Sequence, residues 1–375
     1  MTLEYAGSEK FIANKNTPPG CKPIQRANPI IKVDRLSYLL WDEANLDKQE
    51  DFLLDFGMKT HKKDQQSLYM RGFGDEPYLY VAKKAKKSAF RGLGVSVNSR
   101  AELERLANKT GKSIEKITHP GGGEVVRLID PKGIEVEVCF GIQKVSPIET
   151  RLEPLPVNAP GNPQRVNSFQ RTSFQPSPVL KIGHCVMGAN NIEETIQWYM
   201  THLGVIATDV LCVEDGSPAI AFLRLDRGDQ HADHHTIVIG KGGGEGYLHS
   251  AYEVVDVDAV AQGQQYLKMK KRNHYWGMGR HFLGSQVFDY WHDINGNEFE
   301  HYTDGDVFTS ERETAYHPLD PGNIYAWGDD LPAAMFRPKP KQIWNILGGM
   351  FKGDISFSWV KQAKKATSRS PRPWL

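Results

Sequence analysis

Two histidines and one glutamate in the second half of the chain have the residue types needed to hold a metal ion. His184, His249 and Glu300 lie in the short stretches KIGHCVMG, YLHSAYEV and GNEFEHYTD, which have the composition of β-strands. Because alternate side chains of a strand share a face, the three can point to one side of a sheet. Two imidazoles and one carboxylate leave three positions of an octahedral metal open, as in non-haem Fe(II) oxygenases. We therefore predict that these three residues are metal ligands.

The elements that must position these ligands occur twice along the chain. Each half has a strand-like stretch, a helix with apolar residues at helical spacing and, at its end, a hairpin. The second half has VLKIGHCVMGAN, NIEETIQWYMTHLG and INGNEFEHY, and the first has PIIKVDRLSYLLWD, LDKQEDFLLDFGMKT and DPKGIEVEV. A duplication of a unit of well over 100 residues is the simplest account. The predicted fold class is α+β, with tandem βαβββ modules, two in each half.

The first copy lacks the metal-binding residue types. In this alignment KVDR corresponds to KIGH, RGLGVSV to LHSAYEV and DPKGIEVEV to INGNEFEHY. The positions of the three predicted ligands are then taken by Arg35, Gly92 and Glu137. Because an arginine and a glycine cannot replace two imidazoles, we expect the first half to bind no metal.

Proline-rich and polar stretches divide the chain. Three prolines break a polar N-terminal segment, and Pro, Asn and Ser are frequent from about 146 to 177. We predict an N-terminal arm (1–28), an N-terminal domain of βαβββ repeats without metal (29–145), a linker (146–177), a catalytic domain of βαβββ repeats (178–330) and a basic C-terminal tail (331–375).

Composition excludes several classes of function. The net charge is +1, so nothing draws the whole molecule to nucleic acid or to a membrane surface. No apolar run reaches the roughly 18 residues of a spanning helix, and the N-terminus has no secretory signal pattern. The four cysteines form no CxxC pair, which is typical of reduced thiols. We predict a cytoplasmic protein that binds neither nucleic acid nor membrane.

The stretch GRHFLGSQVFDYWHDINGNEFEHY (279–302) resembles the signature of the type I extradiol ring-cleaving catechol dioxygenases of the vicinal oxygen chelate superfamily. His281 precedes Tyr290 by nine residues, and Tyr290 precedes Glu300 by ten, as in that family. GHCVMG and LHSAYEV match the strands of its first two ligands, and the resemblance covers roughly residues 30 to 305. One departure is the turn His-Asp-Ile-Asn-Gly, where the family usually has Asp-Pro-x-Gly; Asn-Gly also forms turns well.

The resemblance implies a fold and a reaction. The fold is two half-barrel domains of the vicinal oxygen chelate type. The reaction is extradiol cleavage of a catechol by O₂ at Fe(II), or at Mn(II), which the same ligands suit. Its product is of the hydroxymuconic semialdehyde type, and its setting is aromatic catabolism. The resemblance also implies a homo-oligomer, with a tetramer favoured.

The resemblance assigns further roles residue by residue. His235, fourteen residues before His249, would face the oxygen, stabilise developing negative charge and donate a proton; His234 is the alternative. His281 and Tyr290 would hydrogen-bond a substrate oxygen. Trp276 is a further candidate for the substrate pocket.

Three other functions remain open from the sequence. An enzyme like 4-hydroxyphenylpyruvate dioxygenase would need wider ligand spacing than 65 and 51 residues, and a C-terminal helix that the pattern does not indicate. A glyoxalase-like isomerase would take a fourth protein ligand. A non-catalytic protein that sequesters an aromatic ligand would have no need of the full set of candidate ligands and catalytic residues. The presence of that set argues against this function. The neutral net charge favours a hydrophobic or bulky catechol over a carboxylated one.

Overall fold

The computed structural model describes residues 17–171, 173–242, 244–332, 335 and 340–368. Its first half consists of two βαβββ modules. They are β1 (Arg35–Glu43), α1 (Leu46–Asp55), β2 (Lys59–Lys63), β3 (Ser67–Arg71) and β4 (Tyr80–Lys84), followed by β5 (Ala89–Ser96), α2 (Arg100–Thr110), β6 (Glu115–Lys116), β7 (Glu124–Ile129) and β8 (Glu135–Phe140).

The second half repeats this order and adds elements at its end. The third module is β9 (Lys181–Gly188), α3 (Ile192–Leu203), β10 (Ile206–Cys212), β11 (Pro218–Arg224) and β13 (Ile237–Gly240), with the short β12 (Ala232–Asp233) before β13. The fourth is β14 (Gly246–Glu253), α4 (Val257–Met269), β15 (Asn273–His281), β16 (Val287–His292) and β17 (Glu298–Thr303). The added elements are β18 (Val307–Phe308), β19 (Ala315–Pro318), the 3-10 helix η1 (Pro321–Asn323), β20 (Tyr325–Gly328), α5 (Pro340–Lys352) and α6 (Phe357–Thr367).

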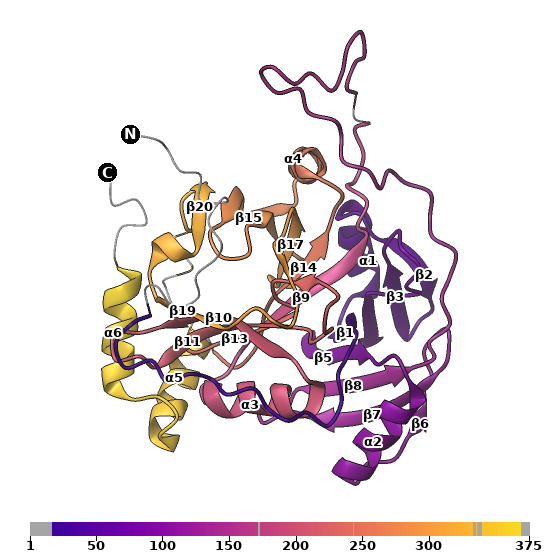
Figure 1. Ribbon diagram of the computed structural model, residues 1–375. Helices are drawn as coiled ribbons and strands as arrows, with labels where there is room; N and C mark the ends of the chain where they lie inside the picture. The colour runs from indigo at the N-terminus through magenta and orange to yellow at the C-terminus, as the bar shows by residue number, and fades with distance from the viewer. Residues whose placement is uncertain (1–16, 172, 243, 333–334, 336–339, 369–375) are drawn as a thin grey trace.

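Each half folds into one large sheet (Figure 1). The first has eight strands in the order β2-β3-β4-β1-β5-β8-β7-β6, and the second has ten in the order β19-β10-β11-β13-β9-β14-β17-β16-β15-β20. In both sheets the two modules join through the antiparallel pairing of their first strands, β1 with β5 and β9 with β14. The last strand of the second module pairs in parallel beside this junction, as β8 or β17. The centre of each sheet therefore contains three strands from both modules.

Local sequence explains where the four module helices begin. The residue before each helix is polar, and its side chain accepts a hydrogen bond from the backbone N–H three positions later. These N-cap residues are Asn45, Ser99, Asn191 and Asp256. Two of the helices end at a glycine with left-handed backbone, Gly111 and Gly204, a conformation that costs glycine little.

One hydrophobic core runs through both halves. Trp41 of the first sheet packs edge-to-face on Tyr247 of the second, with ring centroids 4.8 Å apart. Phe56 stacks on His301 at 3.8 Å, and the backbone carbonyl of Phe56 lies 2.6 Å from Nε2 of that histidine. His301 is therefore one of the contacts between the two halves, and it lies on β17 next to Glu300.

The end of the chain is helical, which the sequence analysis did not predict. Trp359 and Ala366 of α6 are buried beside Leu211 and Ala219, on the outer part of the second sheet. Gly348, Gly349 and several lysines interrupt the apolar pattern of this region, so it has the composition of a solvated tail. Figure 1 shows both helices near the end of the sheet that is formed by the edge strand β19 and its neighbour β10. Among the described residues, no helix combines the length and apolarity needed to cross a membrane.

The segments without regular structure are attached at defined points. In the N-terminal arm the backbone N–H of Ile24 donates to the hydroxyl of Tyr316, at 2.6 Å. Between the two sheets, Arg151 forms two hydrogen bonds to the carboxylate of Asp256, the N-cap of α4. The described part of the arm therefore lies against the second half although it precedes the first half in the sequence. The predicted domain boundaries stay predictions.

Candidate metal centre

The three predicted ligands meet at the middle of the second sheet. His184 lies on β9, His249 on β14 and Glu300 on β17, which are neighbouring strands. Nε2 of His184 is 3.2 Å and Nε2 of His249 is 3.5 Å from the same carboxylate oxygen, Oε2 of Glu300. The ligand atoms of all three lie within 4.8 Å of one another. Strand pairing thus brings together residues that are 65 and 51 positions apart.

The polar atoms of this group are buried without adequate partners. Glu300 is fully buried, and neither of its oxygens has a hydrogen bond of acceptable geometry, although imidazole nitrogens face both. A buried charge without compensation is costly, and a cation between these atoms would remove that cost. The donor set of two imidazoles and one carboxylate suits Fe(II) or Mn(II).

The protonation states favour metal binding. Burial raises the pKa of Glu300, but the imidazoles of His184, His249 and His281 outweigh burial and hold it well below its ordinary value. Burial lowers the pKa of His184, and the adjacent Glu300 offsets this only in part. A carboxylate and a neutral imidazole are the forms that coordinate a metal, so little proton release opposes binding.

His281 and Tyr290 lie beside this group and contact each other. Nδ1 of His281 is 2.8 Å from the carbonyl oxygen of Ile324, and Nε2 is 3.0 Å from the hydroxyl of Tyr290. Because a carbonyl only accepts, Nδ1 must carry the hydrogen, so Nε2 of the neutral ring accepts from Tyr290. Burial and the charge of Glu300 raise the pKa of Tyr290 well above its ordinary value. Its hydroxyl therefore stays protonated and donates its hydrogen to His281.

Trp276 forms a wall beside the two residues. Its ring stacks on Tyr290 with centroids 5.4 Å apart, and its indole N–H donates to the carbonyl oxygen of Asp329 at 2.8 Å. Since that N–H is already used, Trp276 offers an apolar surface to a ligand and no hydrogen bond.

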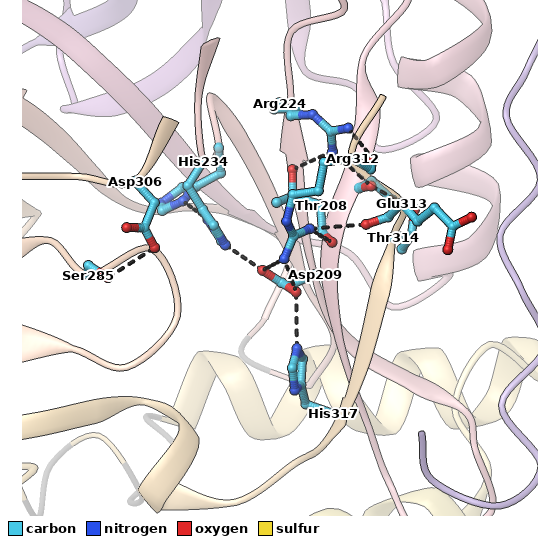
Figure 2. Close-up of polar contacts among 12 residues, drawn as sticks. Thr208, Asp209, Arg224, His234, Ser285, Asp306, Arg312, Glu313, Thr314 and His317 are labelled. Carbon is cyan, nitrogen blue, oxygen red and sulfur yellow. Dashed lines mark hydrogen bonds and ion pairs between the residues drawn. The ribbon is translucent and has the colours of Figure 1, made fainter. Parts of the chain in front are cut away.

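The structure places His235 at the cavity and turns His234 away from it. The ring of His235 lies 4.1 Å from that of His184, centroid to centroid, and His235 lines the same cavity that the predicted ligands His184 and His249 border. Burial, with His184 and His234 close by, lowers the pKa of His235 well below its ordinary value. His234 points instead toward Asp209 (Figure 2), with Nε2 2.5 Å from a carboxylate oxygen. Of the two alternatives from spacing, His235 has the position that the chemistry needs.

The cavity has a volume of about 380 Å³ and a mostly apolar wall. Its apolar side includes Val186, Leu211, Ile220, Phe222, Val238 and Leu248. Sequence reasoning missed other lining residues, among them Gln286, Asn323, Met335 and Gln342. Gln342 belongs to the unpredicted helix α5, so no local signal could have placed it here. Trp327 does not line the described cavity and is half exposed.

The first half has positions equivalent to those of the predicted ligands, but other residue types occupy two of them. One of the three matches in the sequence alignment was wrong. Tyr38 pairs with Gly94 of β5, and Gly94 pairs with Glu137 of β8, just as His184, Ala251 and Glu300 pair in the second sheet.

Tyr38, not Arg35, is therefore the counterpart of His184. Matching KVDR to KIGH shifted the alignment by three residues, since Arg35 pairs with Ser96 as Lys181 pairs with Glu253. Gly92 and Glu137 were matched correctly to His249 and Glu300.

The chain was compared with known proteins. No family model matches it. "Metapyrocatechase 2" of Cupriavidus necator is 26% identical over 316 residues, which cover 83% of this chain and 94% of that relative. Homoprotocatechuate 2,3-dioxygenase of Brevibacterium fuscum has the same fold with a TM-score of 0.69 at 17% identity, over 84% of each chain. A Mn(II)-bound glyoxalase of Novosphingobium aromaticivorans gives a TM-score of 0.67 at 21% identity, over 82% of this chain and 96% of that one.

These similarities confirm two predictions. The resemblance to the type I extradiol dioxygenases of the vicinal oxygen chelate superfamily extends over most of the chain. The predicted class, α+β with tandem βαβββ modules in two sheets, matches the fold of the solved structures.

Proposed function

We propose that this chain, a relative of the type I extradiol dioxygenases, cleaves the ring of a catechol with O₂ beside its two hydroxyl groups. Both oxygen atoms enter the product, an open-chain compound of the hydroxymuconic semialdehyde type. One observation carries the proposal. The buried carboxylate of Glu300 has no adequate partner, faces three imidazoles and lies under an apolar cavity of aromatic size.

In this proposal His184, His249 and Glu300 hold Fe(II), or Mn(II). The bound ion would bring the two catechol oxygens and O₂ together and lower the barrier to electron transfer between them. We propose the same three residues as the ligands on the grounds of their donor types, burial and spacing.

The residues around the ligands manage binding and protons. Tyr290 has a hydroxyl that stays protonated and gives its hydrogen to His281, so its oxygen can accept a hydrogen bond from a substrate hydroxyl. His235 stands on the other side of His184, where it can stabilise negative charge that develops on oxygen and donate a proton. Trp276 and Phe222 confine the ring and exclude water.

The cavity wall supports an uncharged, apolar substituent on the catechol. Its aliphatic side chains would be buried further by such a group, at about 25 cal/mol per Å² of apolar surface. Among the described lining residues there is no lysine or arginine to pair with a substrate carboxylate. A bulky alkyl or aryl catechol is therefore the proposed substrate class.

The first test is O₂ uptake and visible absorbance with anaerobically Fe(II)-loaded protein. The panel contains catechol, an alkylcatechol, an arylcatechol and two carboxylated catechols. We expect one O₂ consumed per diol, a yellow product, and kcat/KM highest for the apolar compounds. After reaction in ¹⁸O₂, mass spectrometry of the product should show two ¹⁸O atoms. The structure of the product identifies the ring bond that was cleaved. One iron per chain with no turnover of any catechol would contradict the proposal.

That negative outcome points to a second candidate, a protein that sequesters an aromatic ligand. It would retain binding of iron and catechol without O₂ consumption. The helix α5, which lines the cavity through Gln342, also removes one argument against an enzyme like 4-hydroxyphenylpyruvate dioxygenase. 4-Hydroxyphenylpyruvate therefore belongs in the panel, where we expect no O₂ uptake.

We further propose that the chain forms a homo-oligomer, with a tetramer favoured. Helix α5 and the start of α6 expose Trp344, Phe351 and Phe357, each at least 74% accessible. Large aromatic side chains in a group on one surface are typical of protein interfaces. Sedimentation velocity of the wild type and of a Trp344→Lys, Phe351→Lys double variant measures the oligomeric state. If both proteins sediment as single chains, the proposal is contradicted.

A further inference from the structure

A buried network connects the cavity histidine His235 with the carboxylate of Asp209 on β10, and Figure 2 shows its part from His234 to His317. Nδ1 of His235 lies 2.8 Å from Nδ1 of His234. Nε2 of His234 lies 2.5 Å from Oδ2 of Asp209, on β10. Oδ1 of Asp209 lies 3.0 Å from Nε2 of His317, on β19. The described contacts therefore form a continuous chain that begins at the metal cavity.

The charge of Asp209 fixes the start of this chain. Asp209 is 2% exposed, and burial raises the pKa of its carboxyl, but hydrogen bonds from His234 and His317, with the electrostatic effects of His234 and Arg312, hold it far below its ordinary value. As a carboxylate it can only accept, so Nε2 of His234 must carry a hydrogen. Arg312 lies 3.1 Å from Oδ1 and already supplies a positive charge.

Hydrogen positions then follow along the chain. A neutral His234 with its hydrogen on Nε2 has a lone pair on Nδ1, which faces Nδ1 of His235. The second ring must then donate, so His235 carries its hydrogen on Nδ1 and leaves Nε2 as an acceptor on the cavity side. The packing leaves the rings of His234 and His235 little room to rotate. Phe222 lies edge-on to both rings, and a side chain at Gly284 would meet the ring of His234 at 3.1 Å.

We propose that Asp209 and His234 are positioning residues that set the orientation and tautomer of His235, so that its Nε2 presents a lone pair to the metal cavity. An imidazole in this form can take the proton of a diol hydroxyl of the substrate, and the resulting cation can then stabilise negative charge on oxygen and return that proton. The opposite tautomer could only donate at that place. The inference rests on the proposed function for its meaning in catalysis, but the tautomer itself is a property of the chain.

Nitrogen NMR of the full-length protein tests the tautomer directly. The protein is labelled with ¹⁵N-histidine and loaded with Zn(II) as a diamagnetic substitute, and a His235→Asn variant assigns the signals. We expect a protonated Nδ1 and an unprotonated Nε2 for His235, and the reverse arrangement for His234. A hydrogen on Nε2 of His235 would overturn the proposal. This result stands whether or not any catechol is cleaved, so failure of the proposed function is seen separately in the wild-type assay.

Variants of the iron-loaded protein test the consequence. Asp209→Asn and His234→Leu should each lower kcat by about 10–100-fold, the usual effect of removing a partner of a residue beside a metal site, with KM changed less than about threefold. His234→Asn places an amide oxygen near the former Nδ1 and should restore most of kcat and the tautomer of His235. His317→Asn is the matched control, because it removes an equivalent contact to Asp209 but none toward His235.

The control separates positioning from folding. If His317→Asn lowers stability without lowering kcat, while His234→Leu lowers kcat, the positioning role is supported. If Asp209→Asn does not fold, the comparison of His234→Leu with His234→Asn tests the proposal alone. Unchanged kcat in His234→Leu, or equal losses of kcat in His234→Leu and His317→Asn, would overturn the proposal.

Discussion

Glu137 and Glu300 occupy equivalent positions in the two sheets, but their carboxylates differ in their hydrogen-bond partners. Glu137 accepts a hydrogen bond from Tyr38 at 2.6 Å and another from Arg127 at 2.8 Å, so the protein itself satisfies its charge. Glu300 faces imidazoles at 3.2–3.6 Å and has no adequate hydrogen bond.

The strand register makes the comparison specific. Arg127 pairs with Glu137 on the neighbouring strand just as Tyr290 pairs with Glu300. Where the second half has room for a cation, the first half has a guanidinium. A buried carboxylate is retained in both, and what differs is the source of the positive charge. Four predictions test this difference.

The largest effect is expected when each glutamate is replaced by its amide. Glu300→Gln removes the only charged ligand, so iron affinity should fall at least about 100-fold, more than is usual for loss of an outer partner. O₂ uptake should be lost with it. Glu137→Gln should keep one iron per chain and normal uptake. Iron analysis after dialysis and an oxygen electrode measure both, and loss of iron from the Glu137 variant would refute the comparison.

The residues that pair with the two glutamates come next. Tyr290→Phe should lower kcat about 100-fold, the lower range for a group that transfers or directs a proton, while iron remains bound. Arg127→Met should leave kcat unchanged but lower the free energy of unfolding by about 1–3 kcal/mol, because Glu137 loses a charged partner. Steady-state kinetics and urea unfolding distinguish the two. A drop in kcat for the arginine variant would show that the first half contributes to the reaction.

Gly92 stands where the second half has His249, and the backbone there leaves no space. A Cβ at Gly92 would lie 2.0 Å from the carbonyl oxygen of Glu135. Gly92→Ala should therefore lower the free energy of unfolding by about 1–3 kcal/mol, without effect on iron content. Gly348→Ala is the control, since nothing lies within 4 Å of a Cβ there, and it should be neutral or slightly stabilising. Equal stability of the two variants in urea would show that the strand can shift.

The smallest effect concerns Tyr38, the counterpart of His184. Burial, with Cys139 and Glu137 close by, raises its pKa well above the ordinary value, so the folded state binds this proton more tightly than the unfolded state. The contribution to stability is complete below about pH 10 and is lost as pH rises above it, by about 1.4 kcal/mol per pH unit. Tyr38→Phe should make the alkaline loss of stability less steep by that amount. Urea unfolding between about pH 9 and 11 measures it, and identical slopes would contradict it.

Much of the site could be predicted because its signals are local. The stretch 279–302 contains a histidine, a tyrosine and a glutamate at fixed spacing on one hairpin, and strand geometry converts that spacing into a shared face. The N-cap residues likewise mark the module helices. The structure places His281, Tyr290 and Glu300 side by side, and their catalytic roles stay predictions.

Alignment by similarity failed where the repeat has diverged. Arg35 was matched with His184 because both follow a lysine and an apolar residue. In the structure both first strands have an irregularity at the same place, before Tyr38 and before His184, and only the pairing partners show the true correspondence. A shift of a strand by an odd number of residues moves every side chain to the other face, so the error changed which residue faces Glu137.

The sequence by itself determined the residue types of the candidate metal centre, the βαβββ repeat and the absence of imidazoles from the equivalent positions of the first copy, because these depend on spacing within single strands and hairpins. Only the tertiary structure decided that His235 and not His234 faces the cavity, that Asp209 lies behind them, and that α5 contributes to the wall. These facts depend on which distant segments pack together, since Asp209 and Gln342 reach the site through contacts across the fold. Local pattern contains no information about such contacts.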